Sequence, residues 1–139
     1  MLAPRDDGTA ARSSSRWAAA ALGATATLAA MELSPDKVKA LLDAGEIQLV
    51  DVREDYEWEA GRIAGARHIE MERLAGEATT IDRATPVVFS CRVGARSGMA
   101  AQAFRASGYD AYNLEGGLLA WADRGLPLEP DGSAYVADH

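Results

Sequence analysis

One stretch, residues 87–104, constrains the fold of this 139-residue chain more than any other. It opens behind a proline with a β-branched and aromatic run, residues 87–89, which is typical of a buried strand. About residues 97–107 then carry apolar side chains at helical spacing. The only cysteine of the chain, Cys91, and the flexible Gly94 lie between the two. The stretch therefore predicts a strand, a loop and a helix, with a thiol where the strand ends.

The loop around Cys91 favours a reactive cysteine. Backbone N–H groups at a helix N-terminus lack helical partners, and the helix dipole there favours an anion. Arg92 and Arg96 add positive charge, which also favours the nucleophilic thiolate. Gly94 lets the loop turn so that its amides form a concave row of donors. A lone cysteine is commonly a small buried hydrophobe, but these features together indicate a nucleophile.

Composition limits what the chain can be and what it can bind. With 48% hydrophobic residues, 139 residues make one domain with a single core. One cysteine cannot form an internal disulfide. The net charge is −7; residues 1–30 hold three arginines and two aspartates, which is +1 and leaves −8 for residues 31–139. Nucleic acid and anionic membranes are therefore not expected partners, and no apolar run is long enough to span a bilayer.

The first 30 residues differ in composition from the rest. We expect residues 1–30 to be a disordered or cleavable extension, residues 31–130 to be the domain, and residues 131–139 to be a flexible tail. An alanine-rich segment follows Arg12 and Arg16, as in a secretory signal, whereas Asp6 and Asp7 are out of place in one. The expected compartment is the cytoplasm, with the periplasm as the alternative if residues 1–30 act as a signal peptide.

From residue 31 onward, strand and helix patterns alternate through short connections. Strands are expected at residues 47–52, 66–69, 87–89 and 110–114, and helices at residues 35–44, 54–60, 97–107 and 118–121, with a weaker helical signal at 71–81. The acidic residues of the 54–60 helix are interpreted as a solvated surface. This alternation predicts an α/β fold, an open, mostly parallel sheet of four to five strands with helices on both faces. Ligands bind such sheets at the carboxyl ends of strands, where Cys91 is placed.

Four motifs, in order and at matching spacing over about residues 31–130, carry a resemblance to a known family. They are residues 49–54 (LVDVRE), 61–69 (GRIAGARHI), 91–97 (CRVGARS) and 114–117 (LEGG), followed by Trp121 and residues 125–127 (GLP). Together they resemble single-domain rhodanese sulfurtransferases.

The resemblance implies a role for each matching residue. Cys91 is the sulfur-carrying nucleophile, and Asp51 and Arg53 are structural supports. The substrate-binding loop that follows the cysteine consists of Arg92, Val93, Gly94, Ala95 and Arg96. One departure is Arg62, which stands where the family often has histidine, so the role of that position stays open.

The implied reaction moves a sulfane sulfur in two steps. The Cys91 thiolate attacks the outer sulfur of thiosulfate or a persulfide donor, and a persulfide forms on the enzyme. Cyanide or a thiol, which a protein can also supply, then takes the sulfur. Arg92 and Arg96 are candidates for binding the donor anion. No cofactor is implied, and no metal either, because neither His68 nor His139 has a second ligand at metal-site spacing.

Two other functions fit the same fold. Cysteine phosphatases and arsenate reductases place five residues between cysteine and arginine, but here four residues separate Cys91 from Arg96. The shorter loop matches a single sulfur atom better than a tetrahedral oxyanion. A non-catalytic binding or regulatory module would commonly lose the nucleophile, which this chain retains.

Overall fold

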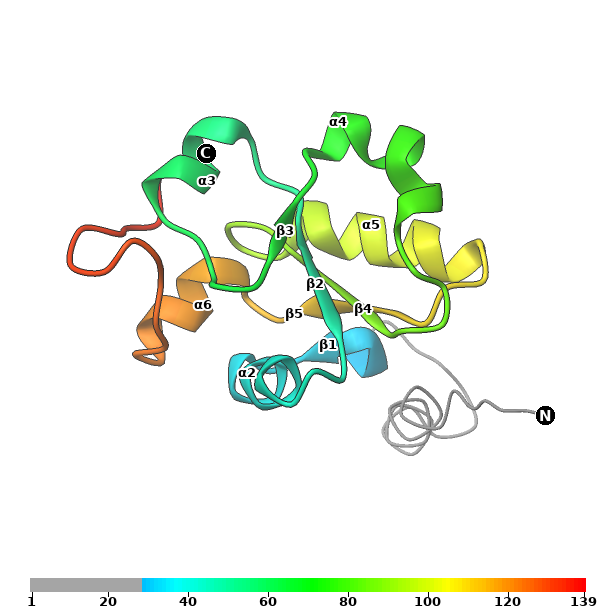
Figure 1. Ribbon diagram of the computed structural model, residues 1–139, viewed down its shortest axis with the longest axis horizontal. Coiled ribbons are helices and arrows are strands. Elements are labelled where there is room, and N and C mark those ends of the chain that lie inside the picture. The colour runs from blue at the N-terminus through cyan, green and yellow to red at the C-terminus, as the bar shows by residue number, and fades with distance from the viewer. Residues whose placement is uncertain (1–28) are drawn as a thin grey trace.

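The computed structural model describes residues 29–139, so nearly all of the expected extension, residues 1–30, lies outside the described residues. A five-stranded sheet forms the centre of the domain (Figure 1). Its strands, in the spatial order β1-β5-β4-β2-β3, are β1 (Glu32–Leu33), β5 (Ala111–Leu114), β4 (Val87–Ser90), β2 (Gln48–Asp51) and β3 (Arg67–His68). All four strand pairs are parallel. The predicted open parallel α/β sheet is therefore confirmed.

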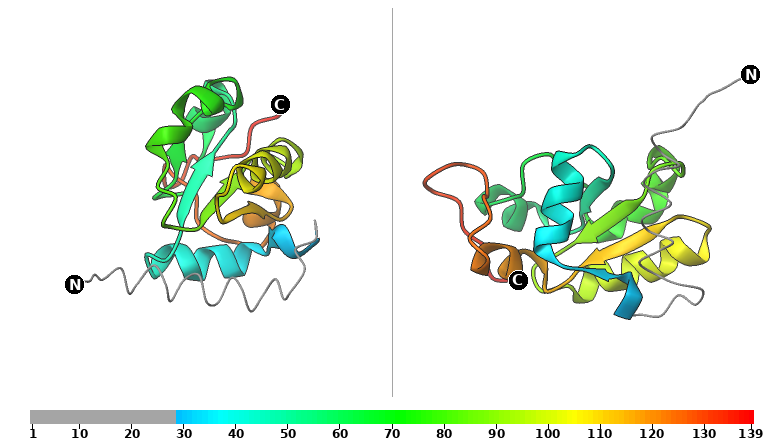
Figure 2. Two further views of the ribbon diagram at one scale, coloured as in Figure 1. Left: turned by 90° about the vertical axis from the view of Figure 1, so that its right-hand side faces the viewer. Right: turned by 90° about the horizontal axis from the view of Figure 1, so that it is seen from below.

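Helices cover both faces of this sheet, as Figures 1 and 2 show. Two of them, α2 (Pro35–Asp43) and α6 (Gly117–Asp123), pack on one face. The other face carries α4 (Met71–Leu74), the 3-10 helix η2 (Ala75–Thr80) and α5 (Ala95–Ala106). The short α3 (Asp55–Ala60) follows the carboxyl end of β2, and the 3-10 helix η1 (Ala29–Met31) precedes β1. None of these helices is long and apolar enough to cross a bilayer.

The central strands are apolar on both sides because both of their faces are covered. In β4, Val87 and Phe89 point into the core beneath α5, whereas Val88 points into the core beneath α2 and α6. All three side chains are completely buried. This two-sided burial explains why the strand reads as a continuous apolar run.

The structure differs from the sequence-based prediction at several element boundaries. Helix α5 begins at Ala95, two residues before the expected start. Gly94 explains the difference, because its φ of 102° turns the chain sharply enough for the helix to begin at the next residue. The weak signal at residues 71–81 corresponds to one turn of α-helix followed by η2. The edge strand β1, which the sequence did not predict, pairs two residues with β5.

Residues 131–139, expected to be a flexible tail, return to the domain beside α3 (Figure 1). The Tyr135 amide donates to the Ala60 carbonyl at 3.0 Å. Val136 packs against the core beneath α6, and Ala137 is buried. The tight approach at Gly61, where a Cβ would lie 2.4 Å from the Tyr135 carbonyl oxygen, fits this contact. The last residues consequently lie next to the end of β4.

A glycine turn between β5 and α6 supports the loop that follows β4. The amides of Leu118 and Leu119, in the first turn of α6, donate to the carbonyls of Cys91 and Arg92 at 2.9 and 3.0 Å. These amides lack helical partners, so the loop carbonyls satisfy them. A Cβ on Gly117 would lie 2.4 Å from the Arg92 carbonyl oxygen. Only glycine allows the two segments to approach so closely.

We predict that Gly117→Ala displaces the loop that holds Cys91. Gly125→Ala is the matched control, because both glycines have positive φ (64° and 75°) but a Cβ on Gly125 meets nothing within 4 Å. Both variants should lose about 1 kcal/mol from the strained backbone. Only Gly117→Ala should lose about 2 kcal/mol more and also slow alkylation of Cys91. Urea unfolding and the iodoacetamide reaction rate measure the two effects, and equal behaviour of the variants would contradict this account.

Candidate active site

The Cys91 thiol lies at the carboxyl end of β4 with three hydrogen-bond donors around its sulfur. The Gly94 amide is 3.1 Å from Sγ, the Ser97 amide 3.4 Å and the Ser97 hydroxyl 3.2 Å. The residue is fully buried and forms no disulfide. Backbone amides converging on one sulfur stabilise negative charge on it. This cradle can hold a thiolate or a sulfur atom bound to it.

A buried asparagine on the neighbouring strand β5 fixes the cradle from behind. The Asn113 side-chain amide donates to the Gly94 carbonyl at 3.0 Å, and its oxygen accepts from the Ser97 hydroxyl at 2.5 Å. The same amide reaches the Glu32 carboxylate of β1 at 3.0 Å. Sequence reasoning missed Ser97 and Asn113 as site residues. A single polar residue within an otherwise apolar strand was the available signal for Asn113.

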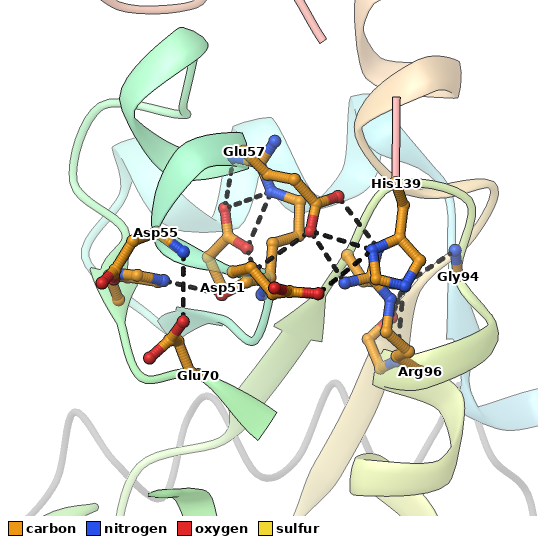
Figure 3. A network of polar contacts seen from close by, with 12 residues as sticks. Asp51, Asp55, Glu57, Glu70, Gly94, Arg96 and His139 are labelled. Atoms are coloured by element: carbon orange, nitrogen blue, oxygen red, sulfur yellow. Dashed lines mark hydrogen bonds and ion pairs between the residues drawn. The ribbon is translucent and has the colours of Figure 1, made fainter. Parts of the chain in front are cut away.

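The Arg96 side chain turns away from the cradle and pairs with Glu57 of α3. Its two terminal nitrogens donate to the two Glu57 oxygens at 2.9 and 3.0 Å. Glu57 is completely buried, so the interpretation of the acidic residues of α3 as a solvated surface is wrong for this residue. Figure 3 shows that Glu57, Arg96 and His139 point toward one another. The sequence could not reveal which carboxylate pairs with Arg96, because four of the six residues at positions 54–59 are acidic.

Glu57 and Arg96 each stabilise the ionised form of the other. Burial raises the pKa of Glu57, but hydrogen bonds from Arg96 and from the Glu54 amide, with the charge of Arg96, together lower it below its ordinary value of 4.5. The hydrogen bond to Glu57 raises the pKa of Arg96 above its ordinary value, although burial lowers it. The charge of Cys91 also acts on Arg96. The guanidinium therefore lies within electrostatic reach of the thiol while its donors are committed to Glu57.

The other residues of the expected substrate-binding loop differ from Arg96, and from one another, in their partners and their exposure. Arg92 pairs with the exposed Asp138 at 3.1 Å, and its Nε is buried with no partner among the described residues. Val93 is half exposed at the tip of the loop. Gly94 precedes α5 in a left-handed conformation, and Ala95 begins that helix. Of the five residues, only Gly94 places a donor on the sulfur.

Asp51 and Arg53 form a buried ion pair at the carboxyl end of β2. The Arg53 Nε lies 2.9 and 3.0 Å from the two Asp51 oxygens, and a terminal nitrogen lies 2.8 Å from one of them. The same terminal nitrogen donates to the Gly61 carbonyl at 2.8 Å. Both side chains are almost completely buried. The pair thus ties the end of β2 to the residue after α3, as a structural support would.

Arg62, whose role the sequence left open, takes part in holding the C-terminal segment. Its backbone pairs with Glu129 in an antiparallel bridge, with hydrogen bonds of 3.0 and 2.7 Å. Its side chain donates to the Trp58 carbonyl at 3.3 Å, and its guanidinium lies 5.5 Å from the centre of the Trp58 ring. These contacts are structural and do not involve Cys91.

A pocket of about 340 Å³ lies beside the cradle. Its lining residues are Val52, Glu54, Glu70, Met71, Glu72, Arg96 and His139. Val52 belongs to the same buried cluster as Cys91, and Met71 packs against that cluster. Ligand atoms of Glu54, Glu57 and His139 lie within 4.8 Å of one another, but both Glu57 oxygens are already bound by Arg96. We assign no metal to this group.

Proteins with similar sequences include some that are named as sulfurtransferases and some that are uncharacterized. The "Putative sulfurtransferase YtwF" of Bacillus subtilis is 36% identical over 97 residues, which cover 69% of this chain and 94% of that protein. The "Thiosulfate sulfurtransferase GlpE" of Pseudomonas aeruginosa is 34% identical over 90 residues, 64% of this chain and 81% of the relative. The "Uncharacterized protein YqhL" of Bacillus subtilis is 42% identical over 78 residues, 55% of this chain. The matched region is 62% of YqhL, less than two thirds of its length.

A solved structure and a family model indicate the same kind of domain as these relatives do. The rhodanese-like domain protein from Staphylococcus aureus superposes with a TM-score of 0.62 at 34% identity, over 69% of this chain and 95% of the other. The family model of the rhodanese-like domain matches residues 34–124, more than half of the chain. With the cysteine at the end of β4 and the resemblance of the four motifs, these matches show that the chain belongs to the rhodanese-like domain family.

Proposed function

We propose that this chain is a sulfurtransferase that carries a sulfane sulfur as a persulfide on Cys91. The observation that carries the proposal is the cradle, in which two amides and a hydroxyl converge on the only thiol of the chain. The donor is thiosulfate or a persulfide, and the acceptor is cyanide or a thiol, on a small molecule or a protein. The names of YtwF and GlpE support sulfur transfer.

In the first step, the Cys91 thiolate attacks the outer sulfur of the donor. A bond forms between Sγ and that sulfur, and the bond from the outer sulfur to the rest of the donor breaks with its electron pair going to the leaving group. Thiosulfate thus releases sulfite. A step that starts from the thiolate needs no general base. The amides of Gly94 and Ser97 stabilise negative charge on the sulfur.

In the second step, the acceptor attacks the outer sulfur of the persulfide. Cyanide forms thiocyanate and returns Cys91 to the thiolate, whereas a thiol acceptor becomes a persulfide itself. The cradle serves both steps, because the departing Sγ regains its negative charge among the same donors. Arg96 contributes through its charge on the thiolate, since its hydrogen bonds go to Glu57.

Cys91→Ser tests the nucleophile. The change is nearly isosteric, so the far-UV circular dichroism spectrum should be unchanged while sulfur transfer falls to background. Intact mass spectrometry after incubation with excess thiosulfate should show one added sulfur on the wild type and none on the variant. Transfer by the variant near the wild-type rate would rule out Cys91 as the carrier.

Arg96→Ala should separate the effect of the Arg96 charge on Cys91 from the effect of the amide donors. Removal of the guanidinium leaves the buried Glu57 carboxylate unpaired, so we expect a loss of about 2 kcal/mol of stability. Alkylation of Cys91 should require higher pH, because a cation that favours the thiolate is gone and a carboxylate remains. An unshifted profile would show that the amides and the helix terminus act alone. Arg124→Ala, at an exposed surface pair with Asp36, is the control.

The length of the loop separates sulfur transfer from phosphatase chemistry. Four residues between Cys91 and Arg96 leave room for one extra sulfur but not for a phosphoryl group. The wild type should therefore transfer sulfur and show no turnover of an aryl phosphate. One glycine inserted between Gly94 and Ala95 should lower sulfur transfer at least about tenfold and improve phosphate binding.

The control for this test is a glycine inserted after the exposed Gly132, which should change neither activity. Efficient hydrolysis of aryl phosphates by the wild type, with Cys91 left unmodified by thiosulfate, would contradict the proposed function.

A further inference from the structure

Residues 138 and 139 form a short strap against the candidate active site. The chain just before them is anchored to the domain, because Ala137 is buried. From this anchor the Asp138 carboxylate reaches Arg92, in the loop after β4, and accepts a hydrogen bond from its terminal nitrogen at 3.1 Å. The strap thereby places a carboxylate of the protein on a guanidinium of the loop that holds Cys91.

The second residue of the strap shows that this contact lies near the pocket beside the cradle. His139 lines that pocket, and its Nδ1 lies 3.4 Å from an oxygen of Glu57 (Figure 3). Because Asp138 is its neighbour in the chain, the Arg92 guanidinium that Asp138 binds is also close to the pocket. An anionic donor that uses this guanidinium therefore meets a carboxylate that is already there.

The ion pair between Asp138 and Arg92 is of a kind that opens readily. The Asp138 side chain is 96% exposed, and exposed ion pairs are weak because water competes with both partners. The contact uses one terminal nitrogen of Arg92, whose Nε has no partner among the described residues. Asp138 thus occupies the guanidinium without satisfying all of its donors, and another anion can replace it at the cost of one hydrogen bond.

Thiosulfate and the Asp138 carboxylate both present negatively charged oxygens, so they compete for the same cation. Building on the proposed function, we propose that Asp138 restrains the site: its carboxylate occupies Arg92 and has to leave before an anionic sulfur donor binds there. The apparent affinity for such a donor is the intrinsic affinity multiplied by the fraction of molecules in which Arg92 is open. For an exposed ion pair, this lowers the affinity about two- to fivefold.

Asp138→Asn tests the strap with two alkylating reagents of similar size, the anion iodoacetate and the neutral iodoacetamide. The Cys91 thiolate displaces iodide from both, so the ratio of the two rates cancels any change in the fraction of thiolate. We expect the iodoacetate-to-iodoacetamide ratio to rise about two- to fivefold in the variant, and kcat/KM for thiosulfate to rise by a similar factor. An unchanged alkylation ratio would overturn the inference.

Two further variants show whether Asp138 acts through Arg92. Asp131→Asn removes the same charge from an exposed position earlier in the same segment and should leave the alkylation ratio unchanged. Arg92→Gln removes the cation and should lower the ratio, and Asp138→Asn added to it should no longer raise the ratio. An equal rise with Asp131→Asn, or a rise that persists in the Arg92→Gln background, would refute competition at Arg92.

The alkylation ratio measures competition by Asp138 without any sulfur transfer, so the strap and the proposed function can fail separately. If thiosulfate adds no sulfur to Cys91 by intact mass, the proposed function fails, and the ratio still decides whether Asp138 competes with an anion. If sulfur transfer proceeds but Asp138→Asn changes neither the ratio nor kcat/KM for thiosulfate, the function stands and the strap is refuted.

Discussion

Two hydrogen bonds from the first turn of α6 determine which way the peptide groups of the Cys91 loop face. Because the amides of Leu118 and Leu119 bind the carbonyls of Cys91 and Arg92, those carbonyls point away from the sulfur. The amides further along, at Gly94 and Ser97, then point toward it. The geometry depends on Gly117, because any side chain there would separate α6 from the loop. A strand end, a glycine turn and two helix N-termini thereby produce a sulfur cradle from backbone groups.

A second constraint on the site is electrostatic and comes from the ion pair between α3 and α5. Arg96 lies in the first turn of α5, where the helix dipole disfavours a cation. The buried carboxylate of Glu57 offsets this and joins α3 to α5 across the site. Because one carboxylate is paired with one guanidinium, the net charge of the pair is close to zero. The positive charge of Arg96 is thus partly offset in the folded site.

The sequence predicts some parts of this structure far better than others. The strands around Cys91 were predictable because each is buried on both faces and so reads as an apolar run. The start of α5 was not, since Gly94 turns the chain in a way that the helical pattern does not record. Glu57 was misjudged because acidic neighbours hide the one carboxylate that faces inward. The packing of residues 131–139 on the domain was not predictable, because the contacts that hold them follow no periodic pattern in the sequence. Those of Val136 and Tyr135 are examples.

The Ser97 hydroxyl has one proton and two neighbours that can accept it, the Asn113 oxygen at 2.5 Å and the Cys91 sulfur at 3.2 Å. While the sulfur is a thiol, its own hydrogen can point to the Ser97 oxygen, and the serine proton can stay on Asn113. Once the sulfur is ionised, the hydroxyl can serve only one of the two acceptors at a time. Rotation of this single O–H bond therefore links the protonation state of the nucleophile to Asn113, and through its amide to Glu32 on the edge strand.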